Sequence, residues 1–339
     1  MRHGNFTFKI FLYFHGASAN PRSIKIKIMQ HFRITIASIL LFLQSGSRGI
    51  DSTLDFRDTV AIRRILDTAS DLHLPIRKLK LGFKMPQPWA NVSPKVVGGE
   101  EASPGEYPFI ASLQWGWITG ESHFCAGVII SESWILTAAH CVEAVPSYGT
   151  LVVKAGKHNI LQQESDEQSR NVVKSFIHPG YEGGVGPWDI GLMKLESPLE
   201  LNAAVAAIKL PAADSVPNGD SILAGWGSIS TSHNPIMPDI LQHAALPLID
   251  LVTCKEAVES LTGPAPSLET NVCTGPLHGG FSACSGDSGG PLIQREGNSE
   301  VLIGLVSWGI VPCGTPGAPS VYTRASAFNA WIEESLANN

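Results

Sequence analysis

The chain has 339 residues, and its 24 Lys and Arg against 30 Asp and Glu leave a formal net charge of −6. A chain with this acidic balance is not expected to bind nucleic acid. Hydrophobic residues make up 44% of the chain, in short runs divided by frequent Gly (33) and Pro (23), which indicates the strands of a β-sandwich or β-barrel.

The charge is divided unevenly along the chain. Residues 1–95 carry 15 Lys and Arg against 5 Asp and Glu, whereas residues 96–339 carry 9 against 25. An asymmetry of this size can indicate an acidic partner, so nucleic-acid binding by the basic leader (residues 1–95) is one alternative. The simpler interpretation is that the basic leader contacts the acidic residues 96–339 of the same chain until the leader is removed.

The leader contains an apolar run of ten residues, 34–43, which follows Arg33. A helix that crosses a bilayer needs about 20 residues, so this run is too short to span a membrane and instead resembles the apolar core of a secretory signal peptide. We expect a signal region at residues 1–47, with synthesis starting at Met29, and residues 8–14 as a weaker second candidate. This predicts a secreted, extracellular protein with no membrane attachment after the signal is removed.

Residues 48–95 are predicted to be a propeptide within a poorly structured leader. Basic stretches occur at 63–64 and 77–80, and the leader contains no cysteine. No disulfide would therefore retain this segment after a cut at its end.

Three segments further along the chain carry chemistry. Residues 137–141 follow apolar runs and place His140 on a turn at the end of a strand, and residues 188–193 place Asp189 at the start of another apolar run. Residues 286–290 place Ser288 on a glycine-rich turn. A serine hydroxyl needs a base to take its proton, a group to orient that base, and donors for the oxyanion that forms.

The order of these residues discriminates between folds. The segment around Ser288 also fits the G-x-S-x-G turn of α/β-hydrolases, in which the histidine follows the serine. The last histidine of this chain is His278, so that alternative fails. The order His140, Asp189, Ser288 is that of the chymotrypsin template.

Six segments in the same order resemble those of chymotrypsin-like (trypsin-family) serine protease zymogens. They are residues 96–99, 136–141, 189–192, 225–227, 286–291 and 306–309. The resemblance covers residues 96–339, the expected catalytic domain, and implies an all-β fold of two six-stranded antiparallel β-barrels with the active site between them. Residues 326–336 are the only helix predicted, because their apolar positions recur near one face.

The resemblance implies a role for each residue of the site. Ser288 is the nucleophile, His140 the base and Asp189 its orienting group, and the N–H groups of Gly286 and Ser288 receive the oxyanion. Peptide or protein substrates would lie along the backbone of residues 307–309 (Ser307, Trp308 and Gly309). No cofactor is implied, and a monomer is expected.

Activation is also implied by the resemblance. A trypsin-like protease would cut after Lys95, and the new α-amino group of Val96 would pair with the carboxylate of Asp287. A buried carboxylate without a partner is costly, so one cut can reshape the neighbouring loops.

Three residues are expected to shape the specificity pocket: Ser282, Gly309 and Ser320. Trypsin-like relatives have an aspartate at the position of Ser282, and a serine cannot neutralise a buried Lys or Arg of the substrate. We therefore predict a chymotrypsin-like preference for large apolar residues before the cleaved bond, with Ser320 making the pocket shallower.

All six cysteines lie beyond the leader, which indicates disulfides and an oxidising compartment. Spacing alone leaves several pairings open, and a zinc site at Cys125, His140 and Cys141 is an alternative, although no C-x₂-C spacing supports it. The resemblance implies three pairs: Cys125–Cys141, Cys254–Cys273 and Cys284–Cys313.

No metal is expected. Residues 156–167 resemble the calcium loop of the family in length, but Lys157 stands at the first ligand position, where a fixed ammonium opposes a hard cation. Lys157 is expected to pair with Glu164 or Glu167 instead.

Two alternatives to a broad-specificity protease are kept. One is a catalytically inactive binding homologue on the same fold, and the other is a regulatory protease of narrow specificity. The presence of all three candidate residues, His140, Asp189 and Ser288, argues against the first.

Overall fold

The computed structural model describes residues 10–11, 51–52, 97–117, 120–297 and 299–339. The chain divides into two units, residues 1–88 and 89–339. In the first unit the described residues are two short strands, β1 (Ile10–Phe11) and β2 (Asp51–Ser52), which pair in antiparallel fashion. The rest of the predicted signal region and propeptide lies outside the described residues.

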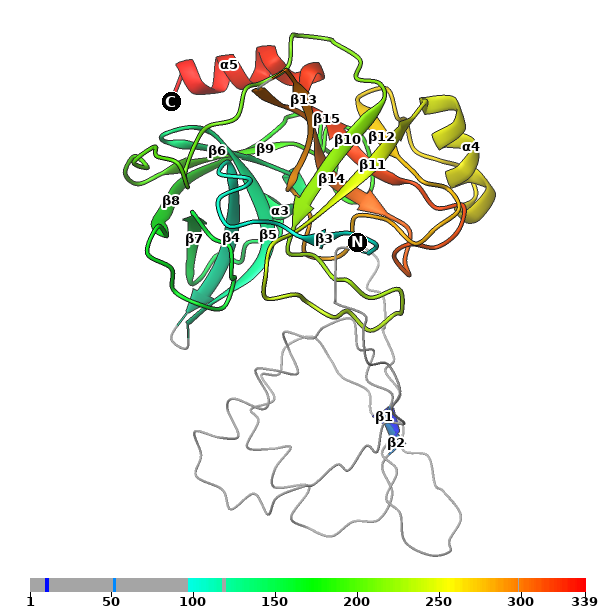
Figure 1. The fold of residues 1–339 in the computed structure, drawn as a ribbon, viewed down its shortest axis with the longest axis horizontal. Coiled ribbons are helices and arrows are strands. Elements are labelled where there is room, and N and C mark those ends of the chain that lie inside the picture. The colour runs from blue at the N-terminus through cyan, green and yellow to red at the C-terminus, as the bar shows by residue number, and fades with distance from the viewer. Residues whose placement is uncertain (1–9, 12–50, 53–96, 118–119, 298) are drawn as a thin grey trace, which may run out of the picture. The chain divides into compact units, whose positions relative to one another are not determined.

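The second unit is built from two closed antiparallel barrels (Figure 1). The first has six strands in the order β4-β5-β6-β9-β8-β7, and pairing of β7 with β4 closes it. Its strands are β4 (Ile110–Trp117), β5 (Gly120–Ser131), β6 (Trp134–Thr137), β7 (Thr150–Ala155), β8 (Gln168–Ile177) and β9 (Gly191–Leu195).

The second barrel has the order β10-β13-β14-β15-β12-β11, and β11 pairs back with β10. Its strands are β10 (Asp220–Gly225), β11 (Gln242–Ile249), β12 (Asn271–Thr274), β13 (Pro291–Glu296), β14 (Ser299–Gly309) and β15 (Ser320–Arg324). The short strand β3 (Glu100–Glu101) adds to the edge of β11. The predicted fold class of two six-stranded barrels is confirmed.

Alternation along the strands fills each barrel with apolar side chains. The first barrel encloses fully buried Leu113, Ile129, Ile135 and Met193, and the second encloses Leu223, Leu246, Leu292 and Tyr322. A further cluster joins the two barrels and includes Leu136, Trp226, Leu305 and Ile332. Each barrel therefore has its own core, and a shared apolar layer fixes one barrel against the other.

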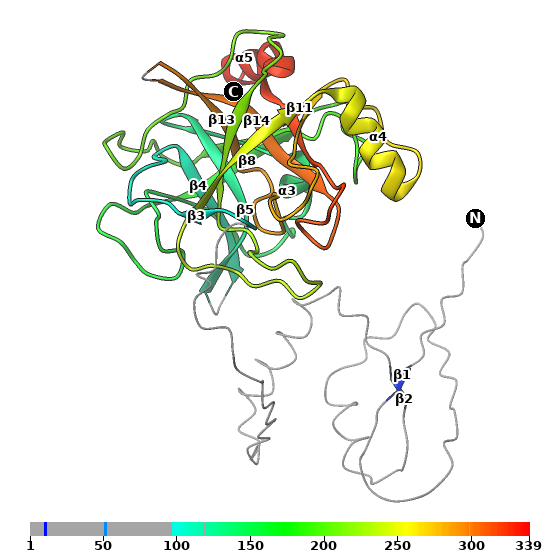
Figure 2. The same ribbon diagram turned by 45° about the vertical axis from the view of Figure 1, so that its right-hand side comes forward.

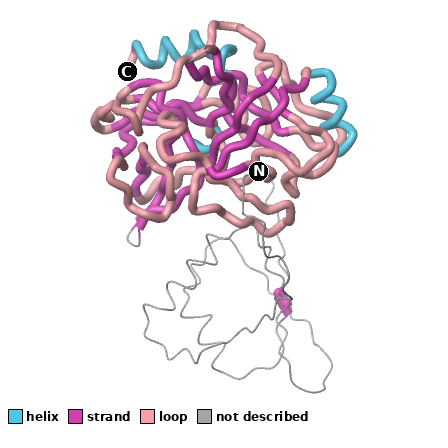
Figure 3. Tube along the Cα trace, in the orientation of Figure 1, coloured by secondary structure: helices cyan, strands magenta, loops and turns pink. Residues whose placement is uncertain are grey.

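Helices α4 (Leu251–Thr262) and α5 (Asn329–Ala337) lie at the periphery of the strands (Figures 2 and 3). The predicted C-terminal helix is present as a 3₁₀ turn, η1 (Ala325–Phe328), followed by α5, with Phe328 and Ile332 buried. A short helix, α3 (Ala139–Glu143), follows β6.

Helix α4, like the short α3, was missed by the prediction that the C-terminal segment is the only helix. Asp250 caps it by accepting hydrogen bonds from the N–H groups of Val252 and Thr253. Its apolar residues Leu251, Cys254, Val258 and Leu261 recur at helical spacing, so the sequence carries a helical pattern that the prediction overlooked, although only Cys254 and Val258 are buried.

Candidate active site

His140 and Asp189 are brought together by the pairing of β6 with β9. Thr137 at the end of β6 lies opposite Gly191 at the start of β9, so the residues that flank these two positions are neighbours. The Nδ1 atom of His140 lies 2.7 Å from Oδ2 of Asp189, and the His140 backbone N–H donates to Oδ1 at 2.9 Å. Because a carboxylate only accepts, Nδ1 of His140 carries the proton and Nε2 presents its lone pair.

The Asp189 side chain is buried and is held from the second barrel as well. The Ser307 hydroxyl, on β14, donates to Oδ2 of Asp189 at 2.6 Å. The Thr323 hydroxyl, on β15, donates to the backbone carbonyl of Asp189 at 2.7 Å. Asp189 also sits in a tight turn in which the Ile190 N–H donates to the Trp188 carbonyl at 2.8 Å. These contacts leave the carboxylate a single orientation toward the imidazole.

Ser288 lies on a turn that packs against the segment ahead of His140. The Ala126 N–H donates to the Ser288 carbonyl at 2.8 Å. Gly289 has a φ of +74°, and a Cβ there would stand 2.1 Å from the Thr137 hydroxyl oxygen and 3.0 Å from the Ala138 nitrogen. Only glycine allows this approach, which places Ser288 beside the turn that carries His140.

The backbone around Ser288 exposes two N–H donors. The N–H groups of Asp287, Gly289 and Gly290 donate to the carbonyls of Cys284, Val306 and Asp287, respectively. Within the described part of the chain, the N–H groups of Gly286 and Ser288 have no protein acceptor. Gly286 has a φ of +101°, a conformation that suits glycine, so its peptide can turn its N–H away from the protein.

A partly buried histidine, His123, holds Gly286. His123 lies on β5 with Nε2 3.0 Å from the Gly286 carbonyl and Nδ1 2.9 Å from the Ser112 hydroxyl. Burial lowers the pKa of His123 to about 4, so the ring is neutral at pH 7. The carbonyl only accepts, so Nε2 donates to Gly286 and Nδ1 accepts from Ser112.

Asp287 is a fully buried carboxylate beside the serine turn. Its Oδ1 accepts from the Gly227 N–H at 2.7 Å and its Oδ2 from the Cys284 N–H at 2.9 Å. Burial raises the pKa of Asp287 to about 6, although these two hydrogen bonds oppose the shift. A Cβ at Gly225 or Gly227 would stand within 2.5 Å of the carboxylate, which explains the glycines on both sides of Trp226.

The residues after the predicted activation cut pack against the segments that contain Gly280 and Gly314. Val97 is buried, and a Cβ at Gly314 would stand 2.8 Å from its side chain. Gly98 has a φ of +81°, and a Cβ there would stand 2.4 Å from the Gly280 carbonyl oxygen. Lys95 and Val96 themselves lie outside the described residues.

A cavity of about 190 Å³ opens beside Ser288. Its walls include Ala283, Cys284, Val306, Trp308 and Gly309, with no charged side chain among the lining residues. Ser307, which bonds Asp189, also lines it. Trp308 and Gly309 also line a second, larger cavity of about 690 Å³, whose walls include Val258, Pro264 and Val311.

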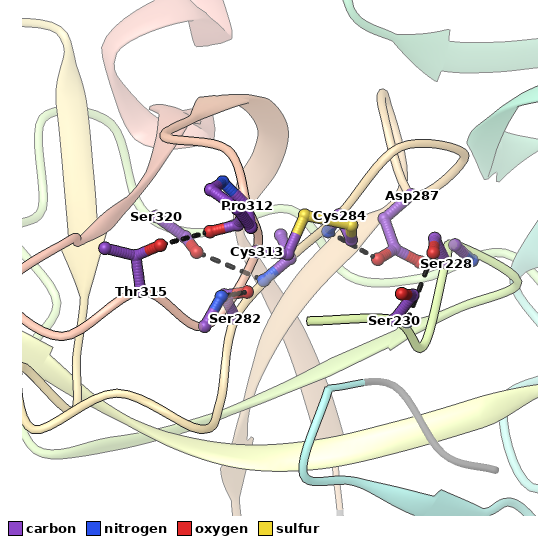
Figure 4. Close-up of a disulfide and its surroundings, with 12 residues drawn as sticks. Ser228, Ser230, Ser282, Cys284, Asp287, Pro312, Cys313, Thr315 and Ser320 are labelled. Atoms are coloured by element: carbon purple, nitrogen blue, oxygen red, sulfur yellow. Dashed lines mark hydrogen bonds between the residues drawn. A yellow bond between two sulfur atoms is a disulfide. The ribbon is translucent and has the colours of Figure 1, made fainter. Parts of the chain in front are cut away.

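Ser282 and Ser320 do not line the smaller cavity directly but contact the segments around it. The Ser320 hydroxyl accepts from the N–H of Ala283 at 3.1 Å, and the Ser282 hydroxyl accepts from the N–H of Gly314 at 2.8 Å. In Figure 4 both serines stand on one side of the Cys284–Cys313 disulfide and Asp287 on the other. Each serine is therefore one hydrogen bond from a segment that walls the cavity.

Three disulfides are formed, and they are the pairs that the resemblance implies: Cys125–Cys141, Cys254–Cys273 and Cys284–Cys313. Cys125, His140 and Cys141 do bring their ligand atoms within 4.8 Å of one another. Since the two sulfurs are bonded to each other, neither is a thiolate, and the alternative of a zinc site at these residues is wrong.

No helix among the described residues has both the length and the apolar character needed to cross a bilayer.

Comparisons with known proteins agree with this geometry. A family model described as Trypsin matches residues 96–332. The chain is 39% identical over 254 residues to Lectizyme of Glossina austeni, an alignment that covers 72% of this chain and 87% of the relative. It is 36% identical over 245 residues to Serine protease 1 of Rattus norvegicus, with coverages of 72% and 91%, and 36% identical over 245 residues to Trypsin of Xenopus laevis, with coverages of 72% and 92%. The chain therefore belongs to the trypsin family of chymotrypsin-like serine proteases and is a serine-type endopeptidase.

Proposed function

We propose that the chain is a secreted zymogen that, once cut after Lys95, hydrolyses peptide bonds with His140, Asp189 and Ser288. The chain would consist of a signal region at residues 1–47, a propeptide at 48–95 and a catalytic domain at 96–339. The observation that carries the catalytic proposal is the 2.7 Å contact between His140 and Asp189 next to the serine turn. The acidic catalytic domain and basic leader fit a precursor whose two parts attract each other.

In this mechanism the Ser288 hydroxyl attacks the scissile carbonyl while Nε2 of His140 takes its proton. The N–H groups of Gly286 and Ser288 receive the oxyanion, a contribution worth about 10²–10³ in rate for each donor. His140 then returns the proton to the leaving amine, which departs and leaves an acyl group on Ser288. A water molecule, deprotonated by His140, releases that acyl group. Asp189 stabilises the imidazolium at each step.

The proposed specificity is for large apolar residues before the cleaved bond. The cavity beside Ser288 has no charged lining residue, and serine rather than a carboxylate stands at position 282. A substrate Lys or Arg would be buried there without a counter-charge, at a cost of several kcal/mol. Gly309 has no side chain to fill the cavity that it lines, and the position where a Cβ would stand has no atom within 4 Å apart from Gly309 itself and its two chain neighbours. The backbone of residues 307–309 would pair with the extended substrate.

Labelling with a serine-directed phosphonyl fluoride tests the catalytic proposal. The cleaved chain should be labelled at Ser288 and lose activity, whereas Ser288→Ala should remain unlabelled. Absence of labelling in a folded, cleaved chain would favour the inactive binding homologue. A panel of peptides varied at the residue before the cut then tests specificity. Dominant cleavage after Lys or Arg would contradict the apolar preference, and cleavage of only one or a few sequences would favour a regulatory protease.

Activation is tested by Lys95→Gln. The variant should stay intact and inactive when mixed with a trypsin-like protease that activates the unchanged chain. Full activity of an uncut Lys95→Gln chain would refute the proposed role of Val96 and Asp287.

A further inference from the structure

The loop between β7 and β8 encloses a cation that belongs to the chain itself. The side chain of Lys157 is 2% exposed, although lysine is rarely buried. Its Nζ donates to the backbone carbonyl of Gln162 and to the carboxylate of Glu167, the latter at 2.8 Å. The Glu164 carboxylate lies 3.7 Å from the same nitrogen. The ammonium is therefore surrounded by one neutral and two anionic oxygen groups.

The two carboxylates are fixed by the loop and not only by Lys157. Glu164 also accepts from the backbone N–H groups of His158 and Asn159, at 2.7 and 3.0 Å. Burial acts to raise the pKa of Glu167, but its hydrogen bond and charge interaction with Lys157 lower the pKa below its ordinary value. Glu167 is thus anionic at neutral pH, and both carboxylates point at the Lys157 nitrogen.

Two carboxylates and a backbone carbonyl directed at one point are the donor set that Ca²⁺ prefers. A loop of this length holds calcium in members of the family, so the fit of that metal to this chain can be judged from its residues. They do not fit, because the ammonium of Lys157 occupies the point at which the oxygens converge. A divalent ion could enter only if Lys157 left, which would expel a paired charge from a buried position.

The loop is tied to the core near the candidate active site. The His158 carbonyl accepts from the Trp226 indole N–H at 3.1 Å and from the Leu241 N–H at 2.9 Å. Trp226 precedes Gly227, whose N–H binds Asp287. The ion pairs of Lys157 therefore stabilise a loop that contacts Trp226, the residue before the Gly227 that binds Asp287.

We propose that this loop is a cation site permanently filled by the Lys157 ammonium, so that the folded chain neither binds nor requires calcium. The inference is independent of the proposed catalytic function, because each of its tests measures stability or metal binding. All measurements use the full chain with Ser288→Ala, which prevents self-digestion.

The first test is the melting temperature of that chain with 10 mM calcium and with excess EDTA. The two values should agree within about 1 °C, since a ligand that does not bind the folded state cannot stabilise it. A rise of roughly 5 °C or more in calcium would overturn the proposal.

The second test compares two lysines that contact the same carboxylate. Lys157→Met should lower the melting temperature by roughly 10 °C, because it leaves Glu167 and the Gln162 carbonyl buried without their cation. Lys154→Met is the matched control: Lys154 lies 3.5 Å from Glu167 and 3.2 Å from Glu121 but is 22% exposed, so its loss should lower the melting temperature by under about 3 °C. Equal effects of the two changes would contradict an internal cation at Lys157.

The third test replaces the Lys157 ammonium by a carboxylate, so that the loop can bind a metal ion. In Lys157→Glu, a third carboxylate replaces the ammonium, so isothermal titration should detect one calcium ion per chain. Calcium at 10 mM should then raise the melting temperature of this variant by roughly 5 °C, as expected for a dissociation constant near 10⁻³ M or below. A folded Lys157→Glu chain that binds no calcium would show that these oxygens do not form a cation site. The first test uses the chain that keeps Lys157, so it decides the proposal even if a variant fails to fold.

Discussion

Cleavage after Lys95 should stabilise the folded chain by an amount that depends on pH. Asp287 is fully buried, and its described hydrogen-bond donors are two backbone N–H groups rather than a cation. In the proposed activation, the new α-amino group of Val96 supplies that cation. The uncut chain must instead carry the cost of an unpaired buried carboxylate whenever Asp287 is ionised.

The magnitude follows from the pKa of Asp287, which burial raises from 3.8 to about 6. A raised pKa means that folding favours the protonated acid. Asp287 therefore costs the uncut chain no stability below pH 3.8, and this cost grows to about 3 kcal/mol as the pH rises through 6. Pairing with the Val96 ammonium should offset this loss. At pH 7.5 the cut chain should melt roughly 9 °C above the uncut chain, and the difference should approach zero near pH 4.

The assay compares two forms of a Ser288→Ala chain by circular dichroism between pH 4 and pH 8. One form is cut after Lys95 by an added trypsin-like protease, and the other carries Lys95→Gln and stays intact. His123 also titrates in this range: because burial lowers its pKa to about 4, both forms lose stability as the pH falls from about 6.5 through 4. Comparing the two forms at the same pH removes this common contribution.

Asp287→Asn supplies the control, since an amide has no charge for Val96 to neutralise. In that background the gap between cut and uncut chains should lose its pH dependence. A gap of equal size at pH 4.5 and pH 7.5 in the chain that keeps Asp287 would refute the pairing, as would the absence of any gap.

Three further predictions concern the site. Ser282→Asp should shift preferred cleavage toward Lys and Arg, because it places a carboxylate next to the cavity wall; an unchanged ranking of kcat/KM over a peptide panel would contradict the proposed pocket. Asp189→Asn should lower kcat by about 10⁴-fold, since an amide no longer holds His140 with its proton on Nδ1, and the melting temperature distinguishes this loss from unfolding. Gly227→Ala should destabilise the chain by roughly 3 kcal/mol or more in denaturant unfolding, because the added Cβ would lie 2.3 Å from the Asp287 carboxyl group. Gly186→Ala, where a Cβ meets nothing within 4 Å, should change stability by under about 1 kcal/mol, and similar losses for the two glycines would contradict this account.

The sequence predicted those parts of the site whose pattern is local. Glycines around Ser288, a histidine at the end of an apolar run and a carboxylate at the start of another are visible within a few residues. The two barrels followed from the resemblance, because strand pairing such as β7 with β4 joins segments that share no local signal. Helix α4 could have been predicted as well, because Leu251, Cys254, Val258 and Leu261 recur at helical spacing directly after the Asp250 cap.

The parts that the sequence did not show are contacts between distant residues. The bond from His123 to the Gly286 carbonyl joins positions 163 residues apart. Ser307 was expected only to offer its backbone to substrate, yet its hydroxyl holds Asp189. The residues next to His123 and Ser307 in the chain do not indicate these partners. A hydrogen bond between distant residues depends on how the two barrels pack and not on the spacing of residues in the sequence.

Several contacts that shape the candidate site cross from one barrel to the other. Asp189 ends a turn of the first barrel but is held by Ser307 of the second, and His123 of the first fixes Gly286 of the second. The Gly289 backbone packs against Thr137 in the same way. Neither barrel therefore contains an active site by itself, and the local motifs are necessary without being sufficient. The chemistry depends on how accurately the shared apolar layer positions the two barrels against each other. Labelling of Ser288 tests that position directly, whereas the sequence motifs do not.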